Sequence, residues 1–172
     1  MMVIHTSPGT PSLLAQIIDR NGPLPATAAF NGCVLEPGRI YTAVPDHHLL
    51  ARDHRVALSD EPAEAYLRPS IDKLFHSVAA DYGSQSIGVL MSGLLHDGVA
   101  GLRAIKAAGG ITVVQDPTDA LFPDLPQNAL KAGVADYTVA ACNIGGLLAR
   151  LAGRDADAKT PDPQGGWDRR PA

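Results

Sequence analysis

A predicted strand and a predicted helix meet in the stretch Met91-Ser92-Gly93-Leu94-Leu95-His96-Asp97-Gly98, which decides the fold. Residues 87–91 form an uncharged aliphatic run, which is typical of a buried strand in a parallel sheet. Residues 98–108 carry apolar side chains at helical spacing and are followed by two glycines. Asp97 is therefore expected on a loop between strand and helix, where α/β sheets place catalytic groups. The simpler interpretation is that Asp97 caps the helix that follows it.

The composition is that of one globular domain. The chain has 172 residues, of which 45% are hydrophobic, and a formal net charge of −4. Its basic residues are scattered, so we expect no nucleic-acid partner. No apolar stretch approaches the roughly 20 residues that span a bilayer, and the N-terminus has no signal-peptide pattern, so we expect no membrane insertion and a cytoplasmic location. Cys33 and Cys142 have no metal-type spacing, and no metal site is expected.

Alternating strand and helix patterns predict an α/β fold with a doubly wound, mostly parallel sheet flanked by helices. Further strands are expected at residues 2–5, 111–114 and 134–139, and further helices at residues 11–20, 70–83, 125–132 and 143–151. Two turns predict a small β-hairpin region, with pairing within residues 33–44 and within residues 49–58. Residues 1–153 are expected to form the domain, and residues 154–172, rich in Asp, Pro, Gly and Arg, a disordered tail.

Ser7 lies on a second loop between a predicted strand and a predicted helix. Loops of this kind meet at one edge of a parallel sheet, so Ser7 and Asp97 can come together. The N–H groups of the helix N-terminus could stabilise an oxyanion. A serine becomes a nucleophile when a histidine, oriented by a carboxylate, takes its proton. Ser7 and Asp97 would supply two of these three groups; otherwise Ser7 is a turn or capping residue.

Several ordered blocks of the sequence resemble one known family. Residues 90–102 resemble a signature loop of Thr-Gly-Met-Gly, one variable residue and Asp-Gly-Ala. Similar blocks occur at residues 35–41, 45–49, 68–77, 115–116 and 125–129. The family is that of the chemotaxis protein-glutamate methylesterases, the CheB family, and the similarity runs from residue 33 to residue 151 with a shorter match at the N-terminus.

This resemblance implies a carboxylic ester hydrolase that removes methyl groups from glutamate side chains of methyl-accepting chemoreceptors, and that in some members deamidates glutamine. It implies Ser7 as nucleophile, because Ser7-Pro8-Gly9-Thr10-Pro11 aligns with Ser-Thr-Gly-Gly-Pro of the family. It implies Asp97 as the carboxylate that orients the histidine. Pro8, Gly9 and Leu94 would belong to the oxyanion or substrate loop. No metal or organic cofactor is expected.

The catalytic histidine is the point at which the sequence departs from the family. The family carries it in a Gln-His-Met-Pro-like motif between the first helix and the hairpin, but residues 19–31 contain no histidine and are too short for a strand and a helix. The sequence therefore predicts that this unit and its general base are missing. His5 is a candidate surrogate because it shares a face with Ser7 in an extended segment. We expect, however, that His5 does not bridge Ser7 and Asp97.

Two functions therefore stay open, an active serine esterase and a catalytically degenerate module that binds chemoreceptors or signalling proteins. The family's receiver domain does not precede Met1, so we expect any phosphorylation control to come from a separate receiver-domain protein. A missing strand–helix unit would expose a sheet edge, which also favours a homodimer. A nucleotide-binding module is disfavoured, because the glycine-rich phosphate-binding motifs are absent.

Overall fold

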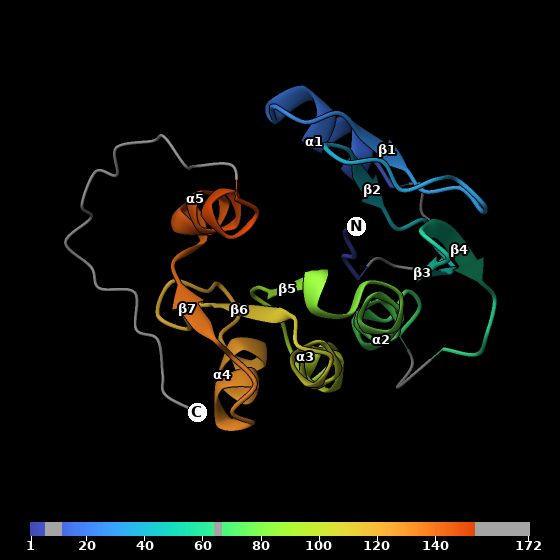
Figure 1. The fold of residues 1–172 in the computed structure, drawn as a ribbon. Helices are drawn as coiled ribbons and strands as arrows, with labels where there is room; N and C mark the ends of the chain where they lie inside the picture. Colours follow the sequence, from blue (N-terminus) through green and yellow to red (C-terminus); the bar gives the residue numbers. More distant parts are fainter. Residues whose placement is uncertain (6–11, 64–66, 154–172) are drawn as a thin grey trace.

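The computed structural model describes residues 1–5, 12–63 and 67–153, and it shows an α/β fold (Figure 1). Ser7, Pro8, Gly9 and the predicted tail at residues 154–172 lie outside the described residues. The elements follow in the order α1 (Leu14–Asn21), β1 (Ala26–Ala28), β2 (Ile40–Thr42), β3 (His48–Arg52), β4 (Arg55–Ser59), α2 (Ile71–Tyr82), the short 3-10 helix η1 (Gly83–Gln85), β5 (Ile87–Leu90), α3 (Val99–Ala107), β6 (Ile111–Gln115), α4 (Asp124–Lys131), β7 (Tyr137–Val139) and α5 (Ala141–Leu151).

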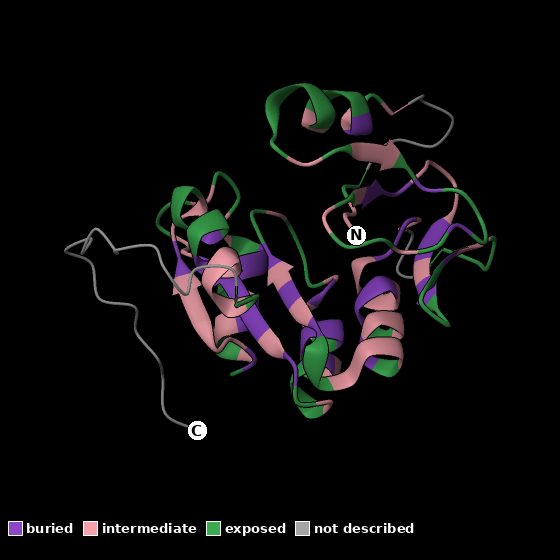
Figure 2. Cartoon of the chain, turned by 45° about the horizontal axis from the view of Figure 1, so that its top comes forward, coloured by how far each residue is buried: buried purple, intermediate pink, exposed green. Residues whose placement is uncertain are grey.

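A parallel sheet of three strands, in the order β5-β6-β7, forms one half of the fold. Helix α5 covers one face of this sheet, where Val113 packs against Ile144 and Leu147. Helices α3 and α4 lie on the opposite face (Figure 1). In Figure 2 the buried residues follow the strands and the helix sides that face them. The predicted α/β fold with helices on both sheet faces is confirmed, because the aliphatic runs of β5 and β6 need cover on both faces.

A second parallel group contains β1, β2 and the N-terminal segment. Strand β1 pairs with β2 in register Thr27↔Tyr41. On the other side of β2, the N–H of Met2 donates to Tyr41 O at 2.8 Å and the N–H of Ala43 donates to Met2 O at 2.9 Å. The strand predicted at residues 2–5 is therefore a single bridge at Met2.

Only one of the two predicted hairpins is correct. Strands β3 and β4 form an antiparallel pair across a turn at Asp53 and His54, whose φ angles are 51° and 57°. The hairpin predicted within residues 33–44 is wrong, because β2 pairs in parallel with β1 and Val34 bridges Arg55 instead. The hairpin of β3 and β4 is bonded to α2, where Ser77 Oγ accepts from the N–H of Ala51 at 2.9 Å.

Helices α2 and α3 pack at very close range. Helix α2 begins after Ser70, whose side chain accepts from Lys73 N, and it ends at Gly83, as predicted. A Cβ atom at Gly101 of α3 would lie 2.5 Å from Phe75 Cβ and 3.1 Å from Asp72 Cα. Neither of these atoms is the end of a flexible side chain, so the two helices approach to a distance that only glycine permits. This contact sets the position of the loop between β5 and α3 relative to the start of α2.

The substitution Gly101→Ala is expected to lower the free energy of unfolding by about 1–3 kcal/mol, because overpacking outweighs the higher helix propensity of alanine. Gly145→Ala in α5 is the matched control, since nothing lies within 4 Å of a Cβ at that position. The control is expected to gain about 0.5–1 kcal/mol. Urea unfolding of both variants measures the difference; a Gly101 variant as stable as the control would contradict the close packing.

Candidate active site

Asp97 lies at the carboxyl end of β5 and caps a helix other than the one that follows it. Its Oδ2 accepts from the N–H of Ile71 at 2.6 Å, and its Oδ1 accepts from the N–H of Asp72 at 3.0 Å and from Ser70 Oγ at 2.9 Å. These donors form the N-terminus of α2. Helix α3 instead begins at Gly98, which has φ 105° and no side-chain cap. The simpler interpretation, in which Asp97 caps its own helix, is therefore wrong.

Two carboxylates connect the N-termini of α2 and α3. While Asp97 accepts from the start of α2, the carboxylate of Asp72 in the first turn of α2 accepts from the N–H of Gly101 in α3 at 2.6 Å. Each carboxylate thus satisfies N–H groups that a helix N-terminus leaves without an internal partner. These hydrogen bonds hold the Asp97 loop against the N-terminus of α2.

His5 is the histidine that reaches Asp97. Its Nε2 lies 3.1 Å from Asp97 Oδ2, and its Nδ1 lies 3.1 Å from the carbonyl oxygen of Pro69. The Asp97 side chain is 8% exposed and that of His5 is 35% exposed, so the carboxylate is buried while the imidazole opens to solvent. The sequence predicts His5 only as a surrogate base beside Ser7, and whether it bridges Ser7 and Asp97 stays a prediction because Ser7 lies outside the described residues. The structure places its imidazole against Asp97, because the N-terminal segment ends at the same sheet edge as β5.

The two carboxylates differ in pKa. Burial, the largest influence on Asp97, raises its pKa, but hydrogen bonds from His5, from the backbone of Asp72 and Ile71 and from Ser70 outweigh it, so the pKa lies below the ordinary value. The pKa of Asp72 is raised, first by burial and also by the charge of Asp97, against the opposing N–H of Gly101. Asp97 is therefore the carboxylate that the fold keeps ionised and able to hold an imidazolium.

A buried histidine, His48, holds the backbone of Ser70, one of the residues that donate to Asp97. The backbone N–H of Ser70 donates to Nδ1 of His48 at 3.1 Å, and Nε2 of His48 lies 3.3 Å from the carbonyl oxygen of Pro62. Because Nδ1 accepts, Nε2 carries the proton and donates to Pro62. The neutral His48 ring thus fixes the backbone at Ser70, and with it the hydroxyl that binds Asp97. Sequence reasoning assigned His48 no such role.

The loop that carries Asp97 is hydrogen-bonded to the end of β6, to the loop that follows β6 and to α4. The N–H of Ser92 donates to Gln115 Oε1 at 2.8 Å, the N–H of Gly93 donates to Phe122 O at 2.9 Å, and Asn128 Nδ2 donates to Leu95 O at 2.7 Å. Leu94, predicted to line an oxyanion or substrate loop, is 58% exposed on this loop. Leu95, Leu121 and Phe122 are also exposed, so the loops present an apolar surface beside the site.

Of the residues predicted to carry the chemistry, the structure brings together His5 and Asp97. Ser7, Pro8 and Gly9 lie outside the described residues, so the roles predicted for them stay predictions. Within the described part of the chain, no group of three His, Cys, Asp or Glu side chains could hold a metal ion. None of the described helices is long and apolar enough to cross a membrane. The arrangement that remains is a solvent-accessible imidazole beside a buried carboxylate, a pairing that is suited to general acid–base chemistry.

Comparison with known proteins agrees with this fold and site. The family model described as CheB methylesterase matches residues 1–148. The chain belongs to the CheB methylesterase family. The crystal structure of the Thermotoga maritima CheB methylesterase catalytic domain superposes with a TM-score of 0.82 at 29% identity, and the match covers 87% of this chain and 81% of that chain.

Two curated CheB relatives carry the name protein-glutamate methylesterase/protein-glutamine glutaminase. The one numbered 3 from Anaeromyxobacter dehalogenans is 38% identical over 151 residues, which cover 87% of this chain and 44% of that protein. The one from Pyrococcus horikoshii is 32% identical over 143 residues, which cover 81% of this chain and 39% of that protein. This CheB-family chain therefore spans less than half the length of these relatives.

Because Asp97 caps α2, the variant Asp97→Asn is predicted to lose stability by an amount that depends on pH. Because the folded pKa lies below the ordinary value of 3.8, the contribution of Asp97 to stability is complete above the unfolded pKa and is lost as pH falls through the folded pKa. The variant is expected to be less stable than the wild type at pH 7 by about 1–3 kcal/mol, and the deficit is expected to shrink toward pH 3. Urea unfolding at the two pH values measures it.

Asp72→Asn is the matched control for this experiment. The raised pKa of Asp72 means that its ionisation opposes folding, so this variant is expected to gain on the wild type as pH rises through the carboxyl range. Opposite trends for the two variants support the assignment of Asp97 as the stabilising anion. An Asp97→Asn deficit that is the same at pH 3 and pH 7 would contradict it.

Proposed function

We propose that this chain provides the acid–base machinery of a protein-glutamate methylesterase that also acts as a protein-glutamine glutaminase. The observation that carries the proposal is the 3.1 Å contact between His5 Nε2 and the buried Asp97 carboxylate. The names of the relatives supply the reaction class, and the resemblance to the chemotaxis esterases supplies methyl-accepting chemoreceptors as substrates. A separate receiver-domain protein and a homodimer remain further proposals for its partners.

In this mechanism the Nε2–H of the His5 imidazole donates a hydrogen bond to the Asp97 carboxylate and keeps its proton, which leaves Nδ1 as the base. Nδ1 takes the proton of a serine hydroxyl as the serine Oγ attacks the carbonyl carbon of the glutamyl ester. The imidazolium then protonates the departing methanol, and an acyl-enzyme ester remains. Water hydrolyses that ester by the same proton transfers, which regenerates the serine and releases the glutamate side chain.

Two groups affect the first step, in which Nδ1 takes the proton. Ser7, two positions along the chain, is the nucleophile we propose from the sequence. The carbonyl oxygen of Pro69, 3.1 Å from Nδ1, accepts a hydrogen bond from that nitrogen only while the nitrogen carries a proton. The hydroxyl therefore takes the place of this contact at the unprotonated Nδ1, and Asp97 keeps the ring anchored while it does so.

Release of methanol from a methylated chemoreceptor tests the proposal. The variants His5→Asn and Asp97→Asn are each expected to lower the rate by about 10²–10⁴-fold, because each removes the general base or its orientation. Ser7→Ala is expected to fall to the same level. His96→Asn, next to Asp97 in sequence but exposed, is the matched control and is expected to keep the wild-type rate.

Two results would count against the proposed esterase mechanism. Full methanol release by His5→Asn, with far-UV circular dichroism unchanged, would remove His5 from the mechanism. Receptor binding by the wild type without any methanol release would instead favour the catalytically degenerate binding module.

A further inference from the structure

Strand β5 is the edge of the three-stranded sheet on the side away from β6. The carbonyl oxygen of Ser86 accepts from the N–H of Ile111 in β6 at 2.9 Å. Because successive residues of a strand direct their backbone groups to opposite sides, those of Ile87 and Val89 point away from β6. No strand pairs with this edge among the described residues, so the edge is available for one.

The N-terminal segment presents a second edge of the same kind. Met2 uses both its N–H and its C=O to bond β2. In an extended segment the backbone groups of Val3 therefore point away from β2. In Figure 1 this segment lies between β2 and β5, so its free edge is on the side of β5.

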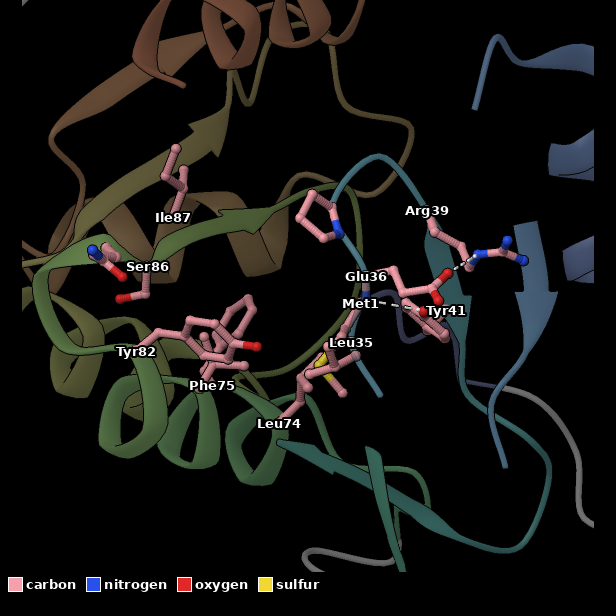
Figure 3. Close-up of a pocket in the computed structure, with 13 residues that line it drawn as sticks. Met1, Leu35, Glu36, Arg39, Tyr41, Leu74, Phe75, Tyr82, Ser86 and Ile87 are labelled. Atoms are coloured by element: carbon pink, nitrogen blue, oxygen red, sulfur yellow. Dashed lines mark hydrogen bonds and ion pairs between the residues drawn. The ribbon is translucent and has the colours of Figure 1, made fainter. Parts of the chain in front are cut away.

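The two edges run in the same direction. At their amino ends, Met1 and Ile87 line one cavity of about 330 Å³ (Figure 3). Beyond their carboxyl ends, His5 is in contact with Asp97, on the loop that follows β5. Since the amino ends of the two edges lie near each other and their carboxyl ends lead to the same contact, a strand lying between the edges could pair in parallel with both.

The cavity at the amino ends suits an apolar strand. Figure 3 shows aliphatic and aromatic side chains around it, among them Leu35, Leu74 and Phe75. The match to the solved catalytic domain covers 81% of that chain, so part of that chain lies outside the match. Residues 154–172 of this chain, with their prolines and glycines, are poor strand formers.

We propose that the free edges of the N-terminal segment and of β5, with the cavity at their amino ends, form an acceptor site for one extended, apolar β-strand from outside these 172 residues. The strand pairs in parallel with β5 and with the segment at Val3, and its first side chains fill the cavity. It would join the two parallel groups into one sheet, and its carboxyl end would emerge beside His5 and Asp97. The proposal concerns binding and does not depend on the proposed esterase activity.

A synthetic peptide tests the acceptor site. The probe is a fluorescein-labelled peptide of five alternating valines and isoleucines with lysines at both ends, and its control carries proline at the centre, which removes a ladder N–H. Fluorescence anisotropy is expected to show binding of the probe and binding at least tenfold weaker for the control. In the NMR hydrogen-exchange spectrum, the amides of Ile87 and Val89 are expected to slow when the probe is added.

Two protein variants locate the edge that binds. Val89→Pro removes an N–H that points away from β6, toward the bound strand, and leaves the hydrogen bonds to β6 in place. This variant is therefore expected to weaken probe binding at least tenfold. Thr138→Pro is the matched control on the opposite edge: because Val139 O accepts from Asp116 N in the β6 direction, the N–H of Thr138 points outward. This variant is expected to bind the probe as the wild type does.

Several results would overturn the proposal. These are absence of probe binding to the wild type, unchanged exchange at Ile87 and Val89 with saturating probe, or slowing at Thr138 instead. If the Val89 variant does not fold, the exchange measurement on the wild type decides alone. Protection of Ile87 and Val89 before the probe is added, with a dimer in sedimentation, would show a second copy as the occupant and would also overturn it.

Discussion

The buried carboxylate of Asp97 is the constraint on which the site and much of the fold depend. It accepts from Ile71, Asp72 and Ser70 and so closes the N-terminus of α2, where the helix dipole favours a negative charge. The loop of Asp97 leaves β5, while α2 carries the hairpin of β3 and β4. This side chain therefore joins the three-stranded sheet to the rest of the molecule, together with the close packing of α2 against α3. Through its remaining contact with His5, the same anion orients a titratable group at the surface.

Local patterns in the sequence were enough to predict the main sheet and the helices around it. The aliphatic run at residues 87–91 and the capped, amphipathic helix from Ser70 to Gly83 are signals that a few neighbouring residues carry in full. The parallel pairing of β1 with β2 was missed because these strands have three residues each and pair across a loop. So short a strand has no periodicity to detect, and its partner is set by packing far along the chain.

The contact between His5 and Asp97 was missed for a different reason. The order of groups expected from the family placed the histidine after the first helix, so the sequence predicted His5 only as a surrogate base facing Ser7. Yet the rule that placed Ser7 and Asp97 at one sheet edge applies equally to His5, which ends the predicted strand at residues 2–5. The roles of Ser70, which donates to Asp97, and of His48, which accepts from the N–H of Ser70, could not be predicted, because they depend on the exact approach of α2 to the Asp97 loop. His5 and Asp97 also lie beyond the carboxyl ends of the parallel strands, which is where α/β folds bind ligands.

The most direct test of this account is ¹⁵N NMR of the histidine side chains at neutral pH. The account predicts that the His5 ring carries its proton on Nε2, hydrogen-bonded to Asp97, and that Asp97→Asn shifts both His5 ring nitrogens while those of exposed His96 stay unchanged. A His5 ring whose nitrogen signals do not respond to Asp97→Asn would contradict the central claim that the buried carboxylate holds this imidazole.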